Sequence, residues 1–182
     1  MVAHVPSGGV TGTPPSQGGA GDMPGEPAVE RLDLPAGYGS PSERLVWADV
    51  RARLEAAPHV WLATVRPDGR PHTVPVDGLW VDGAFWFGGS AETVKHRNLL
   101  LDGRASVHAG DGDAAVIVEG TAELVHPGAG TVEGLRAASA EKYGYAPPAG
   151  AYAGGVWRLR PSKVMAWTSL PVDATRFRFR RG

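Results

Sequence analysis

The chain has 182 residues, with 18 Lys and Arg against 19 Asp and Glu, and it contains no cysteine. This length suits one domain with an extension, and a formal net charge of −1 argues against a general nucleic-acid binder, which needs a positive field. The absence of cysteine excludes disulfides, thiolate metal sites and cysteine nucleophiles. No apolar run approaches the roughly 20 residues of a membrane span, and the first residues lack a signal-peptide pattern. We therefore expect a cytoplasmic protein with no membrane partner.

Composition changes sharply near residue 41. Residues 1–41 hold 9 of the 26 glycines and 7 of the 16 prolines, whereas all six tryptophans lie later in the chain. A segment so rich in glycine and proline buries too little apolar surface to offset the entropy lost on ordering it. The sequence therefore predicts a disordered tail over residues 1–38 and a single folded domain over residues 39–182.

The predicted domain opens with a helix. Ser40 is placed to be its N-cap, Pro41 its first residue and Glu43 the second half of a capping box. Apolar residues then recur at helical spacing and form one stripe, which comprises Val46, Val50, Leu54 and Ala57. Pro58 is expected to end the helix.

Two hairpins are predicted next. Residues 59–65 are rich in β-forming side chains, residues 66–70 have turn chemistry, and residues 71–81 form a second extended run. Asp82-Gly83 predicts a tight turn into a return strand at residues 85–87. Because this hairpin carries four large aromatic side chains, we expect at least one to face outward and to be covered by a subunit interface; they are Trp80, Phe85, Trp86 and Phe87.

The next segments alternate helix and strand. Residues 90–99 are predicted as a short helix with Ser90 as N-cap, and residues 129–143 as a second helix. Between them, residues 104–109 and 114–125 are expected to pair around a turn at residues 110–113.

The C-terminal part is predicted as strand. Residues 153–168 form a long extended run in which Pro161 has to mark an edge or a bulge. Residues 176–180 alternate Arg and Phe, which predicts a strand with two chemically different faces. We interpret this segment as an edge strand guarded by charge; stacking on RNA is the alternative. Hairpin-linked strands with few helices indicate an antiparallel barrel, a mainly β fold.

The most informative segment for function runs from Gly88 to Asn98. A strand leads into Gly88-Gly89 and then into a helix start that carries Lys95, His96 and Arg97. Glycines allow a ligand to approach the backbone, and a helix N-terminus presents free N–H groups and partial positive charge. Together these features suit a phosphate or another anion. The alternative is an ordinary capped surface helix with solvated charges.

Other chemistry is not indicated. The six histidines show neither HxH nor HExxH spacing, so no metal site is predicted. Residues 110–113 resemble a calcium loop only in their first positions and are interpreted as a turn. No nucleophile-elbow or P-loop motif occurs.

Three groups of residues resemble the pyridoxamine 5′-phosphate oxidase-like split-barrel superfamily. Residues 62–71 (LATVRPDGRP) resemble its opening hairpin, and residues 90–104 (SAETVKHRNLLLDGR) are similar to its phosphate-contacting helix, especially the K-x-R-N-L form of the deazaflavin branch. Residues 154–161 with Trp167 and residues 176–181 resemble its final strands. The resemblance implies a six-stranded antiparallel split β-barrel with peripheral helices. It also implies a homodimer that binds FMN or the deazaflavin coenzyme F-420 at the subunit interface.

The resemblance also assigns candidate cofactor-binding residues. Lys95 matches the lysine that contacts the cofactor phosphate, and Trp167 and Arg176 match residues that reach the flavin from the second subunit. Polar and backbone groups around Lys95 and the strand expected to flank the ring complete the set, which consists of Gly88, Gly89, Ser90, Thr93, Arg97, Asn98, Thr73, Val74, Pro75 and Val76. No catalytic acid or base is assigned.

Departures from the family pattern narrow the expected activity. Val74, and Asp77 or Gly78, stand where the true oxidases carry an Arg and a Lys, and Val94 replaces the Arg before the helix lysine. The residues that hold pyridoxal phosphate are absent, so we expect a different reaction. The resemblance implies an FMN- or F-420-dependent oxidoreductase that exchanges hydride with a small organic substrate; the alternative is a non-catalytic flavin or F-420 carrier or sensor.

Overall fold

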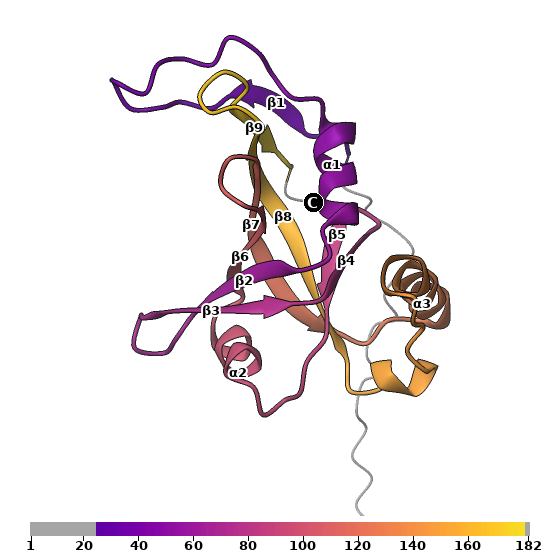
Figure 1. Ribbon diagram of the computed structural model, residues 1–182. Coiled ribbons are helices and arrows are strands. Elements are labelled where there is room, and N and C mark those ends of the chain that lie inside the picture. Colours follow the sequence, from indigo (N-terminus) through magenta and orange to yellow (C-terminus); the bar gives the residue numbers. More distant parts are fainter. Residues whose placement is uncertain (1–24, 181–182) are drawn as a thin grey trace, which may run out of the picture.

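The computed structural model describes residues 25–180, which form one curled antiparallel sheet with three α-helices around it (Figure 1). The strands are β1 (Ala28–Arg31), β2 (Val60–Val65), β3 (Pro71–Val76), β4 (Gly78–Val81), β5 (Ala84–Phe87), β6 (Arg104–Gly110), β7 (Ala115–Val125), β8 (Val156–Trp167) and β9 (Thr175–Arg178). The helices are α1 (Trp47–Ala56), α2 (Val94–Leu101), α3 (Ala129–Tyr143) and the short 3₁₀ helix η1 (Ala149–Tyr152). None of the described helices is both long and apolar enough to cross a membrane.

The sheet forks at β8. Its strand order is β1-β9-β8-β7-β6-β2-β3, and the β4–β5 hairpin joins through pairing of β5 with the first half of β8. The second half of β8 pairs with β9 instead. The sheet does not close, which confirms the split-barrel expectation. Residues 25–180 form nine strands rather than six, because to the seven extended segments expected from the sequence β1 adds one at the edge and the run 71–81 divides in two at Asp77.

Pro161 lies where β8 changes partner. The register against β7 shifts at this point, so that Gly120 faces Pro161 across a bulge. Proline has no N–H to donate to a neighbouring strand. Because a bulge interrupts the ladder of hydrogen bonds, the missing N–H costs no bond there. A Cβ built on Gly120 would lie 2.0 Å from the carbonyl oxygen of Arg160. The predicted bulge is therefore confirmed, and only glycine fits opposite it.

The remaining hairpins follow the sequence signals. Asp82 and Gly83 both have positive φ, 50° and 69°, the geometry of a tight two-residue turn. The Arg66 N–H donates to the Arg70 carbonyl and closes the β2–β3 turn. The predicted pairing of the strands before and after residues 110–113 is observed as β6 with β7, and the helix predicted over 129–143 is α3 with the same bounds.

The predicted start of the first helix is wrong. α1 begins at Trp47 and not at Pro41, because hydrogen bonds to the β8–β9 loop and to β9 hold residues 42–45 outside the helix. The Ser42 and Glu43 N–H groups both donate to the Val172 carbonyl, and the Leu45 N–H donates to Thr175 Oγ1. Val50 and Leu54 of the predicted stripe are fully buried, whereas Val46 is 61% exposed.

The N-terminal boundary of the domain also differs from the prediction. β1 pairs with β9 along its whole length, and Leu32 N–H donates to the Ala174 carbonyl. Glu30 accepts ion pairs from Arg176 at 3.5 Å and Arg178 at 3.0 Å. The part of the predicted tail from residue 28 is therefore folded onto the sheet, and β9 is not an edge strand; residues 1–24 lie outside the described part. A four-residue strand with two apolar side chains gives too weak a pattern to be recognised locally.

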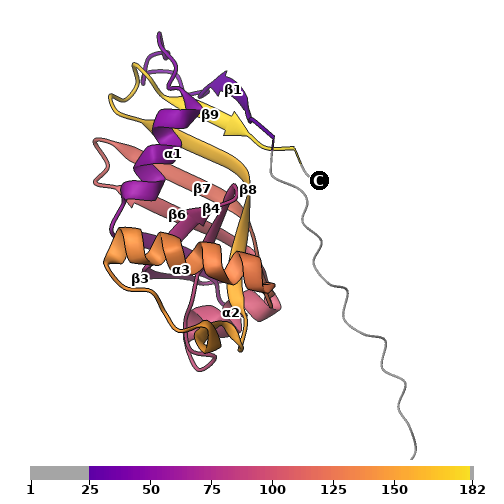
Figure 2. The same cartoon turned by 90° about the vertical axis from the view of Figure 1, so that its right-hand side faces the viewer.

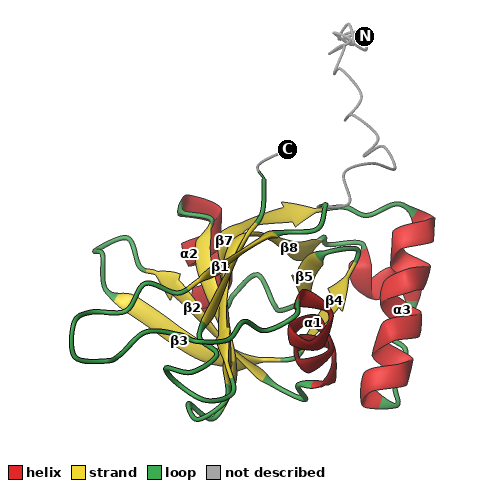
Figure 3. Ribbon diagram, turned by 90° about the horizontal axis from the view of Figure 1, so that it is seen from above, coloured by secondary structure: helices red, strands yellow, loops and turns green. Residues whose placement is uncertain are grey.

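Helices cover the aromatic hairpin. All four of its aromatic side chains are buried, with exposures of 7% or less, so the expected outward-facing aromatic in this hairpin is not observed. Trp47 of α1 packs edge-on against Trp80, with ring centroids 5.8 Å apart, and Leu135 of α3 lies in a small apolar cluster with Trp86. Figures 2 and 3 show α1 and α3 side by side on this part of the sheet.

Candidate functional site

Hydrogen bonds from hydroxyl groups of the loop itself hold the conformation of the chain between β5 and α2. Ser90 Oγ accepts the Glu92 N–H at 3.2 Å, and Thr93 Oγ1 donates to the Ser90 carbonyl at 2.7 Å. Arg97 Nη1 donates to the Glu92 carbonyl at 3.0 Å. These bonds form a turn before the helix, so α2 begins at Val94 with Thr93 as its N-cap, and the prediction of Ser90 as N-cap is wrong.

Lys95 folds back onto the glycines of this loop. A Cβ built on Gly89 would lie 2.5 Å from Lys95 Nζ and 2.8 Å from its Cε, and Gly89 has a φ of +152° that other residues rarely adopt. Glycine at this position therefore leaves the space that the lysine occupies. Lys95 forms no salt bridge with a carboxylate of residues 25–180, so its charge is available.

The charge of Lys95 acts on a pair of basic side chains that contact each other. Arg66, at the end of β2, donates through Nη2 to Nδ1 of His72 on β3 at 3.2 Å. Burial lowers the pKa of His72, and the charges of Arg66 and Lys95 lower it further. A protonated imidazole could not accept the bond from Arg66. The site thus favours negative charge, which would relieve the repulsion among these groups.

Two predicted site residues point inward. Asn98 is 2% exposed and its Nδ2 donates to Thr64 Oγ1 at 3.0 Å, which ties α2 to β2. Val76 is 8% exposed and lies in the main core. Neither side chain is open to a ligand in this structure. The neighbouring His96 accepts the indole N–H of Trp157 on Nδ1 at 3.2 Å, which anchors the other side of α2 to β8.

The other predicted strand residues divide between the two faces of β3. Val74 packs against the core, whereas Thr73 and Pro75 are exposed on the outer face of the sheet. Trp61, which pairs with Pro75, is 52% exposed on that face. One row of paired residues crosses the whole sheet there, in the order Pro75, Trp61, His108, Ile117, Met165, Arg176 and Glu30.

Trp167 and Arg176 lie far from Lys95. Figure 1 shows β9 at one end of the molecule and α2 at the other. Trp167 Nε1 donates to the Gly112 carbonyl at 2.9 Å, and Arg176 lies near Glu30 and Asp33. Within one chain, the structure brings together Gly88, Gly89, Ser90, Thr93 and Lys95 but does not add these two residues to them.

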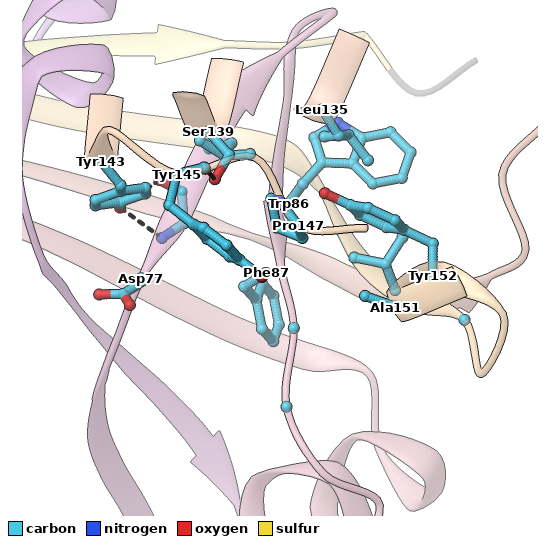
Figure 4. A pocket seen from close by; sticks show the side chains of 16 residues that line it. Asp77, Trp86, Phe87, Leu135, Ser139, Tyr143, Tyr145, Pro147, Ala151 and Tyr152 are labelled. Carbon is cyan, nitrogen blue, oxygen red and sulfur yellow. Dashed lines mark hydrogen bonds between the residues drawn. The ribbon is translucent and has the colours of Figure 1, made fainter. Parts of the chain in front are cut away.

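A cavity of about 420 Å³ is lined in part by the Gly88-Gly89 backbone (Figure 4). It lies between α3, η1, the β4–β5 hairpin and the start of β8, and Tyr143, Tyr145 and Tyr152 contribute to its lining. Sequence reasoning did not identify it, although three tyrosines within ten residues were a visible signal. Within residues 25–180, no group of three or more His, Asp or Glu residues is arranged to hold a metal ion.

An unclosed antiparallel barrel, with a glycine loop that receives a lysine from the following helix, defines this chain as a split-barrel protein. The chain belongs to the Pyridoxamine 5′-phosphate oxidase family, which it matches over residues 46–168. No curated protein matches the chain in sequence.

Solved structures share the fold. A conserved hypothetical protein from Mycobacterium tuberculosis is 22% identical with a TM-score of 0.59, and the match covers 75% of this chain and 89% of that one. An F420 reductase is 22% identical with a TM-score of 0.51, over 72% and 98% of the two chains. A heme binding protein from Mycobacterium smegmatis is 25% identical with a TM-score of 0.54, over 69% and 55%. The resemblance noted in the sequence is thus confirmed at the level of family and fold.

Proposed function

We propose that this protein binds FMN or coenzyme F-420 and acts as an oxidoreductase on a small organic substrate. The observation that carries the proposal is Lys95, whose ammonium lies against Gly89, whose charge acts on His72, and which has no carboxylate partner among the described residues. A phosphate is the kind of group that such a site accommodates. FMN and F-420 both carry one.

The residues present fit the phosphate part of either cofactor. Lys95 would form a charge-assisted contact, and the glycine backbone would allow close approach. Thr93 and Ser90 are already hydrogen-bonded within the loop, which fixes the turn between the glycines and the helix that carries the lysine. An anion beside His72 would favour its protonated form and so raise its pKa. Binding is therefore expected to take up a proton at pH values between the His72 pKa of the free protein and the higher pKa of the complex.

The cofactor, when bound, supplies the redox chemistry, which is the exchange of two electrons as hydride with the substrate. The chain's own contribution is to position the cofactor and to exclude water. No side chain near Lys95 is assigned as a catalytic acid or base. The absence of basic residues at Val74 and at Asp77 or Gly78 supports a substrate other than pyridoxamine phosphate.

We also propose a homodimer. Trp61 leaves an exposed apolar side chain in the middle of the outer sheet face, and Thr73, Pro75 and Arg176 lie on the same face. A second copy across this face would bring its own Trp167 and Arg176 toward residues of β3 that they do not reach within one chain. Light scattering tests this proposal, and a mass near 19.0 kDa at micromolar concentration would contradict it.

Titration with FMN, with F-420 and with hemin is the experiment that tests the cofactor proposal. Saturable binding of FMN or F-420, together with turnover of the reduced cofactor by an organic acceptor, is the expected result. Binding without turnover would favour the carrier or sensor alternative. A Soret band that titrates to one hemin per chain would favour a heme protein, a second candidate supported by the similarity to the Mycobacterium smegmatis heme binding protein.

A further inference from the structure

The cavity under α3 exists because this helix makes a narrow contact with the sheet. Of its fifteen residues, Leu135 and Ser139 are buried, and the apolar cluster beneath it is small. The residues next to the contact include Gly134 and Ala138, which do not fill the space between helix and hairpin. About 420 Å³ is thus left open, a volume within the usual range for a small-molecule site.

Hydrogen bonds hold the walls of this cavity in place. The Tyr143 hydroxyl accepts the Gly78 N–H at 3.0 Å and donates to the Gly78 carbonyl at 3.1 Å. Ser139 Oγ donates to the Tyr145 carbonyl at 2.7 Å, and Arg136 Nε donates to the Pro147 carbonyl at 2.8 Å. The segment that follows α3 is therefore fixed against the helix, so the cavity is preorganised.

The walls are aromatic and carry no positive charge. Trp86 and Phe87 supply the floor from β5, and three tyrosines surround it. Asp77 is the one carboxylate among the described lining residues, and no Lys, Arg or His contributes to the lining. Two cations lie outside the lining and are hydrogen-bonded to its backbone: Lys142 Nζ donates to the Gly78 carbonyl and Arg136 Nε donates to the Pro147 carbonyl. Such a surface suits a planar ring and disfavours an anion.

The Tyr152 hydroxyl is a polar group available inside the cavity. The Tyr152 hydroxyl makes no hydrogen bond to another described residue, and Figure 4 shows its ring beside Ala151 with the hydroxyl directed toward α3. Burial raises the pKa of Tyr152, so the hydroxyl stays protonated at neutral pH and can donate. A carbonyl or similar acceptor on a ring is the partner that it fits.

Gly88 and Gly89 border both sites. Their backbone lines the aromatic cavity, and Lys95 lies against Gly89 from the other helix. We propose that the α3 cavity binds a small organic ligand, a planar ring that bears a hydrogen-bond acceptor and no negative charge. A role of this ligand as the substrate rests on the proposed oxidoreductase function, whereas the binding preference does not.

Two probes of one shape separate charge from size. 2-Naphthamide is neutral, and 2-naphthoate is an anion at pH 7. Isothermal titration of the full chain, with no cofactor added, is expected to give a dissociation constant below about 1 mM for the amide, a reasonable value for a ligand of this size. The naphthoate is expected to bind at least about tenfold more weakly, because its carboxylate would lose its hydration without a cation to replace it. Equal or tighter binding of the naphthoate would overturn the proposal.

Substitutions on η1 test whether the amide binds in the α3 cavity. Ala151 is an exposed lining residue on η1, so Ala151→Trp is expected to fill the mouth and to weaken the amide at least about tenfold. Ala149→Trp, on the same short helix but outside the lining, is the matched control and should change affinity less than about twofold. Tyr152→Phe should weaken the amide by about three- to tenfold through loss of one hydrogen bond. An unchanged affinity in both Ala151→Trp and Tyr152→Phe would place the amide elsewhere and overturn the proposal.

The cofactor titration keeps the two proposals distinguishable. Amide binding that disappears in Ala151→Trp, in a protein that binds neither FMN nor F-420, would retain the cavity as a ligand site and reject the oxidoreductase. Cofactor binding and turnover that are unaffected in Ala151→Trp would retain the oxidoreductase and reject the cavity as its substrate site.

Discussion

Lys95→Ala is the change that tests the anion site most directly. In the structure this lysine makes no salt bridge with a described residue, and its ammonium rests on the Gly89 backbone. Its removal therefore breaks no ion pair in the folded protein. We expect the free energy of unfolding to change by less than about 0.5 kcal/mol, as for an ordinary surface substitution, and the effect to appear in cofactor affinity.

The expected loss follows from the contact that the lysine would make. A hydrogen bond to a charged group contributes about 1.5–3 kcal/mol, which corresponds to a roughly 10- to 150-fold weaker dissociation constant. A solvated lysine would change affinity by less than about twofold. These outcomes are well separated. Because the site is partly open, the parent affinity should also fall as salt is raised.

His72 provides a readout that needs no cofactor. The charge of Lys95 is one of the causes that lower the pKa of His72, after burial and Arg66. Lys95→Ala should therefore raise that pKa toward its ordinary value, as an NMR titration of the imidazole would show. Saturating FMN or F-420 should raise it in the parent protein as well, because a phosphate stabilises the protonated ring.

Arg104→Ala is the matched control for charge. Arg104 lies just beyond the other end of α2, and its side chain is 78% exposed and paired with Asp102. It removes one positive charge without touching the glycine loop, so cofactor affinity and the His72 titration should match those of the parent. If Lys95→Ala binds both cofactors like the parent and leaves the His72 titration unchanged, the anion-site interpretation is wrong.

Three further changes test the fold around the site. Asn98→Ala should lower the free energy of unfolding by about 1–3 kcal/mol in urea titration, because it removes the buried partner of Thr64; an effect below about 0.5 kcal/mol would contradict this. Gly78→Ala should cost about 1–3 kcal/mol or more, since its Cβ would lie 1.9 Å from the Phe85 ring, and a parent-like melting temperature would refute the clash. A chain that begins at Tyr38 should melt several degrees below one that begins at Gly25 because it lacks β1, and equal melting temperatures would show that β1 contributes no stability.

Local sequence signals were sufficient where one turn decides the geometry. Asp82-Gly83 occupies two successive positive-φ positions, and residues 66–70 close a turn through their own backbone. α3 has the predicted bounds because Gly144, with a φ of 69°, ends it locally. In these elements the determinants of structure lie within a few residues of one another, so the pattern alone is informative.

Tertiary contacts decided the elements that the sequence did not predict. The capping-box pattern at residues 40–43 competes with hydrogen bonds to Val172, more than a hundred residues away, and the distant partner prevails. β1 is stabilised by β9 and by the pairing of Glu30 with Arg176 and Arg178. Neither partner can be inferred from the composition of the N-terminal segment.

The candidate site, like the fold, was predicted from the sequence only in part. A glycine pair before a lysine-bearing helix identified Gly88, Gly89 and Lys95, and the structure brings Lys95 into contact with Gly89. The same pattern could not show that Asn98 turns inward to Thr64, because its spacing on the helix suits either role. The α3 cavity depends on how closely a helix approaches a hairpin, and that distance is not encoded in any short motif.

The positions of the two candidate sites follow from the fork in the sheet. Since the first half of β8 pairs with β5, the strand that ends at Phe87 is held between β8 and β4, the other arm of the hairpin under α3. The chain then leaves the sheet at Gly88-Gly89, where the missing side chains expose backbone on both sides. One side meets the basic groups of α2, β2 and β3, and the other meets tyrosines after α3. A phosphate and an uncharged ring could thus both lie next to these two residues, and because Lys95 and Ala151 belong to different elements, separate variants can test the two sites independently.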